Sequence, residues 1–350
     1  MNTASLPTDP AKSAVPPLLE AYSGRRPART PVWFMRQAGR SLPEYRAARV
    51  GVGMLESCLR PDLAAEITLQ PVRRHDVDAA IFFSDIVVPL RLAGVDVEIV
   101  SGVGPVVAEP VRTSGDVDRL VQNGPGDASM ITEAVRLAVA ELGETPLIGF
   151  AGAPFTLAAY LVEGRPSRDH LSARTLMHAD PETWRRLMTW AADISGAFLR
   201  TQVDAGARAA QLFDSWAGAL SLHDYADHAA PFSVRTIGHL DGSGVPVVHF
   251  GTGTSELLVT MRDAGADVVG VDYRLPLDEA NRRLGGTTPL QGNIDPALLA
   301  APWPVLEAHV RDVVARGRAA PGHVVNLGHG VPPTTDPEVL TRVVELVHSL

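Results

Sequence analysis

Short, nearly continuous apolar runs alternate with longer segments of helical periodicity along most of the chain. The runs predict seven strands: Asp78–Asp85, Thr145–Gly152, Arg208–Ser215, Pro246–Gly251, Asp267–Tyr273, Thr288–Ile294 and His323–Gly330. An eighth strand is expected between Val97 and Val111. Because strands of this kind, separated by helices, are typical of a parallel sheet covered on both faces, the pattern favours a single (β/α)8 TIM-type barrel. A doubly wound open sheet is the alternative that strand count alone leaves open.

Capping residues mark where two of the intervening helices begin and end. Thr254 is placed as the N-cap of a helix whose apolar face includes Met261 and which stops at Gly265. Asp295 is placed as an N-cap followed by Pro296 at the first helical position, where a missing N–H costs nothing. Helices with such start and stop signals fit the barrel interpretation.

Polar side chains gather at the carboxyl ends of the predicted strands. They are Ser84-Asp85, Asp214-Ser215, His249, Asp272-Tyr273, Gln291 to Asn293 and Asn326 to His329. A carboxylate in such a place often caps the next helix, and Asp85 taken alone is open to that interpretation. Six polar strand ends are nevertheless expected to converge on one rim, which is where barrel enzymes build their sites.

The segment Gly149–Gly164 adds a turn of small residues and then a helix. Gly152-Ala153-Pro154 forms the turn, and Tyr160 lies about one turn into the helix that follows. From there Tyr160 can offer its phenol to the rim, although simple packing is as good an explanation before other observations.

The stretch PVWFMRQAGRSLPEYR, residues 31–46, ends an apolar run with two arginines around a small-residue turn. Surface solubility would explain the arginines in the simplest way. Arg36 and Arg40 so close to Gly39 instead indicate a bound anion, because guanidinium groups stay charged and grip carboxylates with two hydrogen bonds. Arg49, outside this core, is expected on a solvated helix face.

Composition and charge narrow the class of protein further. The chain has 350 residues, 45% of them hydrophobic, which is an ordinary globular balance. A net charge of −9 argues against nucleic acid as the main partner, so an anionic ligand needs a local basic pocket. The single cysteine, Cys58, allows no internal disulfide and fits a reducing, cytoplasmic compartment. No apolar run reaches the ~20 residues that span a membrane.

Several other features are set aside as carriers of the function. Residues 1–16 lack the apolar stretch of a signal peptide and are expected to be a disordered lead-in. The glycine-rich pieces match neither a dinucleotide-binding nor a Walker motif. The histidines of HDYADH, His223 and His228, are five apart and therefore belong to a solvated helix surface. A thiolate-rich zinc site is impossible with one cysteine, and Ser215 has no evident histidine base.

Seven long motifs resemble those of the uroporphyrinogen decarboxylase family of haem biosynthesis. They are PVWFMRQAGRSLPEYR, DAAIFFSDIVVPL, GFAGAPFTLAAYLVEG, QLFDSWAG, GVDYRLPL, LQGNIDP and NLGHGVPP. The resemblance covers the chain from about Pro31 to its end. Ser41 stands where tyrosine is often found and Tyr273 where tryptophan is common, and the family assigns neither position to the chemistry.

The resemblance implies a single-domain (β/α)8 barrel over residues 17–350 that forms a homodimer and uses no metal or organic cofactor. It implies decarboxylation of the four acetate side chains of uroporphyrinogen III to methyl groups, which gives coproporphyrinogen III. The substrate-contacting positions that it implies are Arg36, Gln37, Ala38, Gly39, Arg40, Asp85, Tyr160, Ser215 and His329.

The chemistry of that substrate explains these residue types. It carries eight carboxylates, which suit arginines and exposed backbone N–H groups, and four pyrrole N–H donors, which suit Asp85 as acceptor. Protonation of a pyrrole carbon makes a cationic ring that accepts the electrons left by CO2, and Asp85 would stabilise that charge. Asp85, Arg36, Tyr160 and His329 are therefore the expected catalytic residues. The proton donor is His329, Tyr160, a water or a substrate carboxyl, since a guanidinium is a poor acid.

Two other functions stay open on the sequence. A zinc- and corrinoid-linked methyltransferase shares this barrel, but its relatives bind zinc through histidine and cysteine, and Cys58 is alone. A non-catalytic anion-binding barrel would bind porphyrinogen without loss of CO2.

Overall fold

A curled parallel sheet forms the centre of the computed structural model, which describes residues 15–350. Its strand order is β1-β4-β5-β6-β7-β8-β9, and every neighbouring pair is parallel. The strands are β1 (Ala80–Ile81), β4 (Leu147–Gly152), β5 (Ala209–Asp214), β6 (Val247–Gly251), β7 (Val268–Gly270), β8 (Leu290–Gln291) and β9 (His323–Val324). All seven runs predicted as strands from the sequence supply one strand each.

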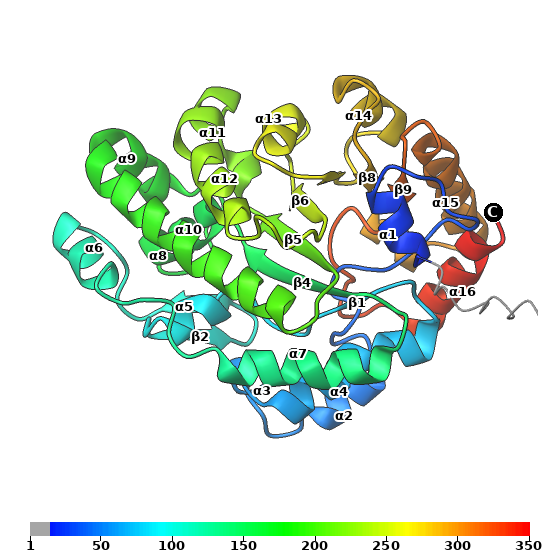
Figure 1. The fold of residues 1–350 in the computed structure, drawn as a ribbon, viewed down its shortest axis with the longest axis horizontal. Coiled ribbons are helices and arrows are strands. Elements are labelled where there is room, and N and C mark those ends of the chain that lie inside the picture. The colour runs from blue at the N-terminus through cyan, green and yellow to red at the C-terminus, as the bar shows by residue number, and fades with distance from the viewer. Residues whose placement is uncertain (1–14) are drawn as a thin grey trace, which may run out of the picture.

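Helices surround the strands on the outside (Figure 1). In chain order they are α1 (Pro17–Tyr22), α2 (Pro43–Ala48), α3 (Met54–Cys58), α4 (Pro61–His75), α5 (Val88–Leu92), α6 (Ser114–Leu120), α7 (Ser129–Leu142), α8 (Pro154–Glu163), α9 (Leu171–Ala179), α10 (Pro181–Asp204), α11 (Leu222–His228), α12 (Ala230–Gly238), α13 (Leu258–Asp263), α14 (Leu277–Arg283), α15 (Trp303–Gly317) and α16 (Pro337–His348), with 3-10 turns η1 (Ala217–Ala219) and η2 (Pro296–Ala300). The predicted lead-in, residues 1–16, lies almost wholly outside the described residues, and α1 begins at Pro17.

The eighth position of the ring is filled by the segment around Val32. Val32 bridges Val325 in parallel, just beyond β9, and the Val325 N–H donates to the Pro31 carbonyl at 2.8 Å. On the other side, the Asp78 N–H donates to the Val32 carbonyl at 2.9 Å, immediately before β1. The segment thus joins the two edges of the sheet, and the barrel-type α/β fold expected from the sequence is confirmed.

The expectation of a barrel strand between Val97 and Val111 is wrong. That region forms an antiparallel hairpin, β2 (Val97–Val100) with β3 (Gly104–Val107), apart from the main sheet. Barrel strands are covered on both faces, whereas β2 alternates and leaves Glu98 and Val100 exposed. The period-two pattern of VEIV is the signal that distinguishes the hairpin from a barrel strand.

The two predicted helix starts differ in outcome. The Asp295 carboxylate accepts from the Ala297 N–H at 2.9 Å, so it caps as predicted, although the turn that follows is 3-10. The Thr254 hydroxyl instead donates to the Gly251 carbonyl at 3.1 Å, and α13 begins four residues later. Thr254 therefore closes the turn after β6 and does not cap the helix.

A chain of polar side chains fills the amino-terminal end of the barrel, where α1 packs. The Tyr22 hydroxyl donates to Gln291 at 2.5 Å, and Gln291 donates to Gln211 at 3.0 Å across the interior. The Trp33 indole completes the chain at 3.4 Å from the Tyr22 oxygen. These side chains fill the interior at this end, with only the Gln211 Nε2 among them left without a partner, so the opposite end remains for a site.

Candidate active site

The opening arginine stretch forms a turn that is anchored to both edges of the sheet. Gln37 is fully buried: its side-chain oxygen accepts from the Phe34 N–H and its amide donates to the Ala79 carbonyl, both at 3.0 Å. The Met35 N–H donates to Asn326 at 2.9 Å. Both polar atoms of the Gln37 side chain are engaged with backbone, so this residue holds the turn in place from within.

Arg36 projects from the tip of this turn into the carboxyl-terminal mouth of the barrel. Its φ of 61° lies in the left-handed region, which is unusual for a side chain larger than glycine. Gly330 makes room for it, because a Cβ added there would lie 2.5 Å from Arg36 Cδ. Gly39 makes room for the Arg36 backbone, since a Cβ added at position 39 would lie 2.9 Å from the Arg36 carbonyl oxygen.

The close approach of Gly330 gives a test of how Arg36 is positioned. We expect Gly330→Ala to push the Arg36 side chain aside and to reduce kcat/KM about tenfold, as for loss of one charge-assisted hydrogen bond. Gly124→Ala is the matched control, because an added Cβ meets nothing within 4 Å there. Equal kcat/KM for Gly330→Ala, Gly124→Ala and the unmodified protein would show that Arg36 is not held by this contact.

Asp85 follows β1 at the mouth and is half-buried. One carboxylate oxygen accepts from the Val87 N–H at 3.1 Å, and the Asp85 carbonyl accepts from the Val88 N–H at 3.0 Å. Burial raises the pKa of the carboxyl, while the Val87 N–H and the charge of Arg36 oppose that rise. The residue therefore closes the turn before α5 and also presents a poorly solvated carboxylate to the mouth.

Tyr160 and His329 complete the group around Asp85. Tyr160, on α8, is 7% exposed and packs edge-on against Trp216 with ring centres 5.8 Å apart. Burial and the charge of Asp85 raise the pKa of Tyr160 to about 12, so its phenol keeps its proton. His329 retains an exposed surface, yet partial burial and the charges of Arg36 and Arg274 lower the pKa of its imidazole.

The charge of Arg36 affects the pKa values of the other three residues in this group. The Arg36 guanidinium acts on the pKa of Asp85, Tyr160 and His329, in each case lowering it. The other three side chains therefore lie within electrostatic range of the Arg36 guanidinium. The structure thus brings together Arg36, Asp85, Tyr160 and His329, which lie far apart along the chain.

The other residues of the opening stretch lie on the outer side of this mouth. Ala38 and Gly39 are half-buried, and Arg40 is exposed. The Arg40 carbonyl accepts from the Arg46 guanidinium at 2.8 Å, which fixes the backbone while leaving the Arg40 side chain available. Arg36 and Arg40 are both exposed, so both guanidinium groups are accessible to an anion.

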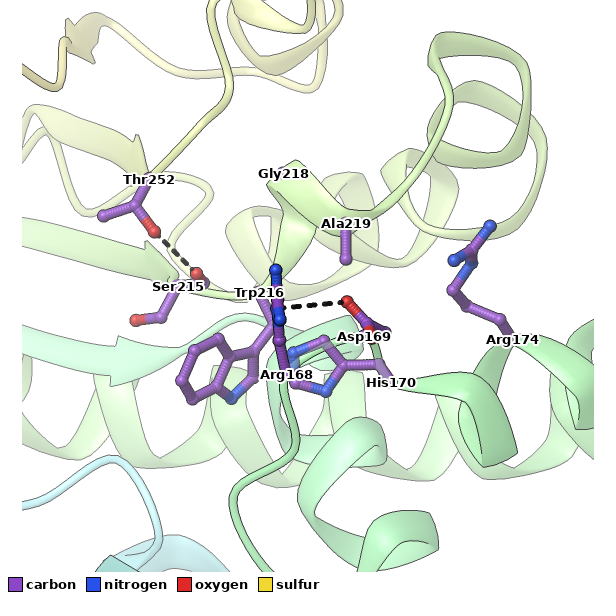
Figure 2. A pocket seen from close by; sticks show the side chains of 9 residues that line it. All are labelled: Arg168, Asp169, His170, Arg174, Ser215, Trp216, Gly218, Ala219 and Thr252. Atoms are coloured by element: carbon purple, nitrogen blue, oxygen red, sulfur yellow. Dashed lines mark hydrogen bonds and ion pairs between the residues drawn. The ribbon is translucent and has the colours of Figure 1, made fainter. Parts of the chain in front are cut away.

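Ser215 lines a pocket of about 320 Å³ at the edge of the mouth (Figure 2). The Thr252 hydroxyl donates to the Ser215 carbonyl at 2.8 Å, and the Trp216 ring packs at a tilt against His170 with ring centres 4.9 Å apart. The pocket is lined by Arg168, Asp169, His170, Arg174, Ser215, Trp216, Gly218, Ala219 and Thr252. Sequence reasoning missed this basic wall, for which the arginines at 165, 168 and 174 were the available signal.

An apolar layer lies below the mouth inside the barrel. Phe213 packs edge-on against Phe150 and Phe250, with ring centres 5.4 Å and 6.1 Å apart. Phe150 and Phe250 are buried, whereas Phe213 remains half-buried. The layer gives the barrel interior an apolar aromatic lining at this level.

Several polar strand ends do not reach the mouth, contrary to expectation. Asp214 alternates with the inward-facing Phe213 and therefore points outward, where it is completely buried beneath the helices. Its carboxylate accepts from Thr156 at 3.0 Å and lies 3.6 Å from the equally buried His249. Gln291 faces the filled amino-terminal end, as described above. These residues support the sheet and do not contribute to the rim.

Other strand-end residues shape the rim without facing it. Asn293 donates to the carbonyls of Asp272 and Leu275, at 2.8 Å and 2.6 Å. The Asp272 carboxylate accepts from the Gly253 N–H at 2.5 Å and from Arg274. Both side chains serve to hold neighbouring turns.

Fold and site together define an α/β-barrel protein with an anion-binding mouth built around one half-buried carboxylate. The family model described as uroporphyrinogen decarboxylase (URO-D) matches residues 14–350. The chain therefore belongs to the uroporphyrinogen decarboxylase family, which confirms the resemblance read from its motifs, and it is a carboxy-lyase of haem biosynthesis.

Individual relatives agree with this assignment. Uroporphyrinogen decarboxylase of Arthrobacter sp. (strain FB24) is 72% identical over 339 residues, covering 97% of this chain and 98% of the relative. The enzyme of Leifsonia xyli subsp. xyli (strain CTCB07) is 67% identical, covering 95% of this chain and 93% of the relative.

A more distant likeness concerns the fold alone. A solved structure of a methyltransferase from Methanosarcina mazei superposes with a TM-score of 0.79 at 20% identity, covering 95% of this chain and 97% of that one. The barrel is thus shared with a protein named for a different activity, so the fold alone does not define the reaction.

Proposed function

We propose that this chain removes the four acetate carboxyls of uroporphyrinogen III as CO2 and so produces coproporphyrinogen III. The observation that carries the proposal is the half-buried carboxylate of Asp85, faced by Arg36, Tyr160 and His329 around one mouth. One carboxylate, one guanidinium and two neutral hydrogen-bonding groups match a macrocycle whose centre donates hydrogen bonds and whose rim carries carboxylates.

Asp85 is assigned the role of holding and stabilising the macrocycle. Its carboxylate accepts the pyrrole N–H groups, and when a pyrrole carbon is protonated it stabilises the positive charge that develops on the ring. Its position is fixed before substrate arrives, because the Val87 and Val88 N–H groups hold its turn. A preorganised charge of this kind loses little energy to reorganisation during the reaction.

The cationic residues are assigned to the substrate carboxylates. Arg36 and Arg40 bind them through their guanidinium groups, with the backbone of the Gln37 to Gly39 turn nearby. Ser215 binds at the pocket where Arg168, which pairs with Asp169 at 3.8 Å, and Arg174 leave a net positive charge. Since the whole chain carries a net charge of −9, these local groups attract an anion that the overall field would repel.

Tyr160 and His329 are assigned to orienting the reacting carboxyl and its proton. The raised pKa of Tyr160 keeps the phenol protonated, so it donates a hydrogen bond to a carboxylate. The lowered pKa of His329 keeps the imidazole neutral near pH 7, able to donate one proton and accept another. Arg36 is assigned to binding because its guanidinium does not release a proton under these conditions.

The decisive experiment is anaerobic incubation of the protein with uroporphyrinogen III, followed by oxidation and chromatography of the porphyrins. The expected result is conversion to coproporphyrin. Porphyrinogen that binds and is recovered unchanged would instead identify a non-catalytic anion-binding barrel.

The reaction needs no metal or organic cofactor, because the protonated pyrrole ring itself accepts the electrons left by CO2. We expect dialysis against a strong chelator to leave kcat/KM unchanged. Activity that disappears on chelation and returns specifically with zinc would favour the methyltransferase-like alternative.

Among the helices of residues 15–350, none has the length and apolar character of a membrane span.

The proposal also includes a homodimer that acts in the cytoplasm. Light scattering coupled to gel filtration should give twice the mass of one chain. A monomer at micromolar concentration would contradict the dimer without affecting the assignment of the active site.

A further inference from the structure

Three potential metal ligands meet outside the active site, between helices α9 and α11. They are His178, in the last turn of α9, with Asp224 and His228 on α11. One ligand atom from each lies within 4.8 Å of the other two. His178 Nε2 is 3.4 Å from Asp224 Oδ1, and the two imidazole rings are 5.7 Å apart. Both helices lie at the same end of the molecule (Figure 1).

The sequence pattern alone had assigned this region to a solvated helix surface. His223 and His228 indeed lie on different faces of α11, as five-residue spacing requires. Asp224 and His228, however, are four residues apart and share the face toward α9. His228 is half-buried there, and only the tertiary structure supplies His178 as the third member.

The three ligands stand on elements that are held independently of any ion. Ser221 caps α11 by accepting from the Asp224 N–H at 3.0 Å. The Trp184 indole, on α10, donates to the His228 carbonyl at 3.1 Å. Asp180 ends α9 and caps α10. Ligands placed on anchored helices lose less conformational freedom on binding than ligands on a loop.

We propose that His178, Asp224 and His228 bind a divalent transition-metal ion of the zinc class. Two imidazoles and one carboxylate are a common zinc donor set, with water at the fourth position. Ligand atoms about 2.0–2.2 Å from a tetrahedral ion lie roughly 3.4 Å apart, which the His178–Asp224 pair already matches. The His228 ligand atom lies within 4.8 Å of the other two, so it must move closer when an ion binds.

Such an ion would connect two helices that frame the substrate mouth. His170, which lines the pocket beside Ser215, directly precedes α9. Trp216 and Ala219, from the same pocket, precede α11. The ion would therefore stabilise the packing of these two helices without touching the reacting atoms, so its removal should lower the thermal midpoint and leave kcat/KM unchanged. This role is independent of the proposed reaction, which requires no metal.

Isothermal titration of chelator-treated protein with ZnCl2 tests the site. One ion per chain is expected. His178→Asn or His228→Asn should each reduce the association constant for zinc at least tenfold, because losing even a residue that only hydrogen-bonds to a metal ligand typically reduces affinity ~10–100-fold. His223→Asn is the control: this histidine lies on the same helix, 3.3 Å from Asp227, and the substitution should leave binding unchanged. Circular dichroism of each metal-free variant verifies folding.

Two results would overturn the site. One is failure of the unmodified protein to bind zinc at micromolar concentrations. The other is unchanged affinity in the His178→Asn, His228→Asn double variant. Co2+ gives an independent readout, because tetrahedral coordination by nitrogen and oxygen should produce a visible absorption band that the double variant lacks.

Discussion

Asp85→Asn is expected to reduce the rate of decarboxylation by about 10²–10³, the usual effect of losing one preorganised electrostatic group. The amide has nearly the same shape as the carboxylate but carries no charge, and its N–H donors face the pyrrole N–H groups of the substrate. Turnover should be measured anaerobically at saturating uroporphyrinogen III, so that the effect on kcat is separated from binding.

The same substitution should leave the folded protein at least as stable. Burial raises the pKa of Asp85 above that of an unfolded aspartate. The ionised form is thus less favourable in the folded than in the unfolded state, and at any pH above the unfolded value of ~3.9 its charge opposes folding. Asn removes that charge. A thermal midpoint equal to or above that of the unmodified protein is expected near pH 7, and wild-type turnover with unchanged stability would refute the catalytic role.

Arg36→Lys and Arg40→Lys are expected to lower kcat/KM by roughly one to two orders of magnitude each. Lysine keeps the charge but loses the planar pair of donors that matches a carboxylate. The loss of a charge-assisted hydrogen bond costs about 1.5–3 kcal/mol, and 1.36 kcal/mol corresponds to one decade. Arg36 should be the more sensitive of the two, because its backbone and Gly330 hold it in a specific position.

The choice of control for this comparison follows from the structure. Arg49 was expected on a solvated helix face, but this expectation is wrong. Its guanidinium donates to Ser57 at 2.9 Å and to Tyr45 and Val52, so Arg49→Lys would disturb packing. Arg136, exposed on α7, is the better control, and surface substitutions of its kind usually stay within ~0.5 kcal/mol. Equal, small effects at positions 36, 40 and 136 would mean that the paired arginines are only surface charge.

The sequence by itself determined the fold class, the family and the residues proposed to act. Near-continuous apolar runs separated by helical periods indicate a parallel sheet with both faces covered. Each run carries this signal in its own residues, independently of how the rest of the chain packs. Residues 31–46 also indicated an anion-binding site from sequence alone, because two arginines around Gly39 combine permanent charge with a backbone that anions can approach. Such signals are contained within short segments.

The tertiary structure decided which of these side chains meet. Val32 closes the ring against Val325, a pairing between the two ends of the chain that no local period encodes. Asp214 turns away from the mouth while its neighbours Phe213 and Ser215 reach it, because successive strand residues face opposite sides of a sheet. His178 joins Asp224 only because two helices pack together. Contacts between distant segments depend on how the elements pack, and packing is a property of the whole folded chain.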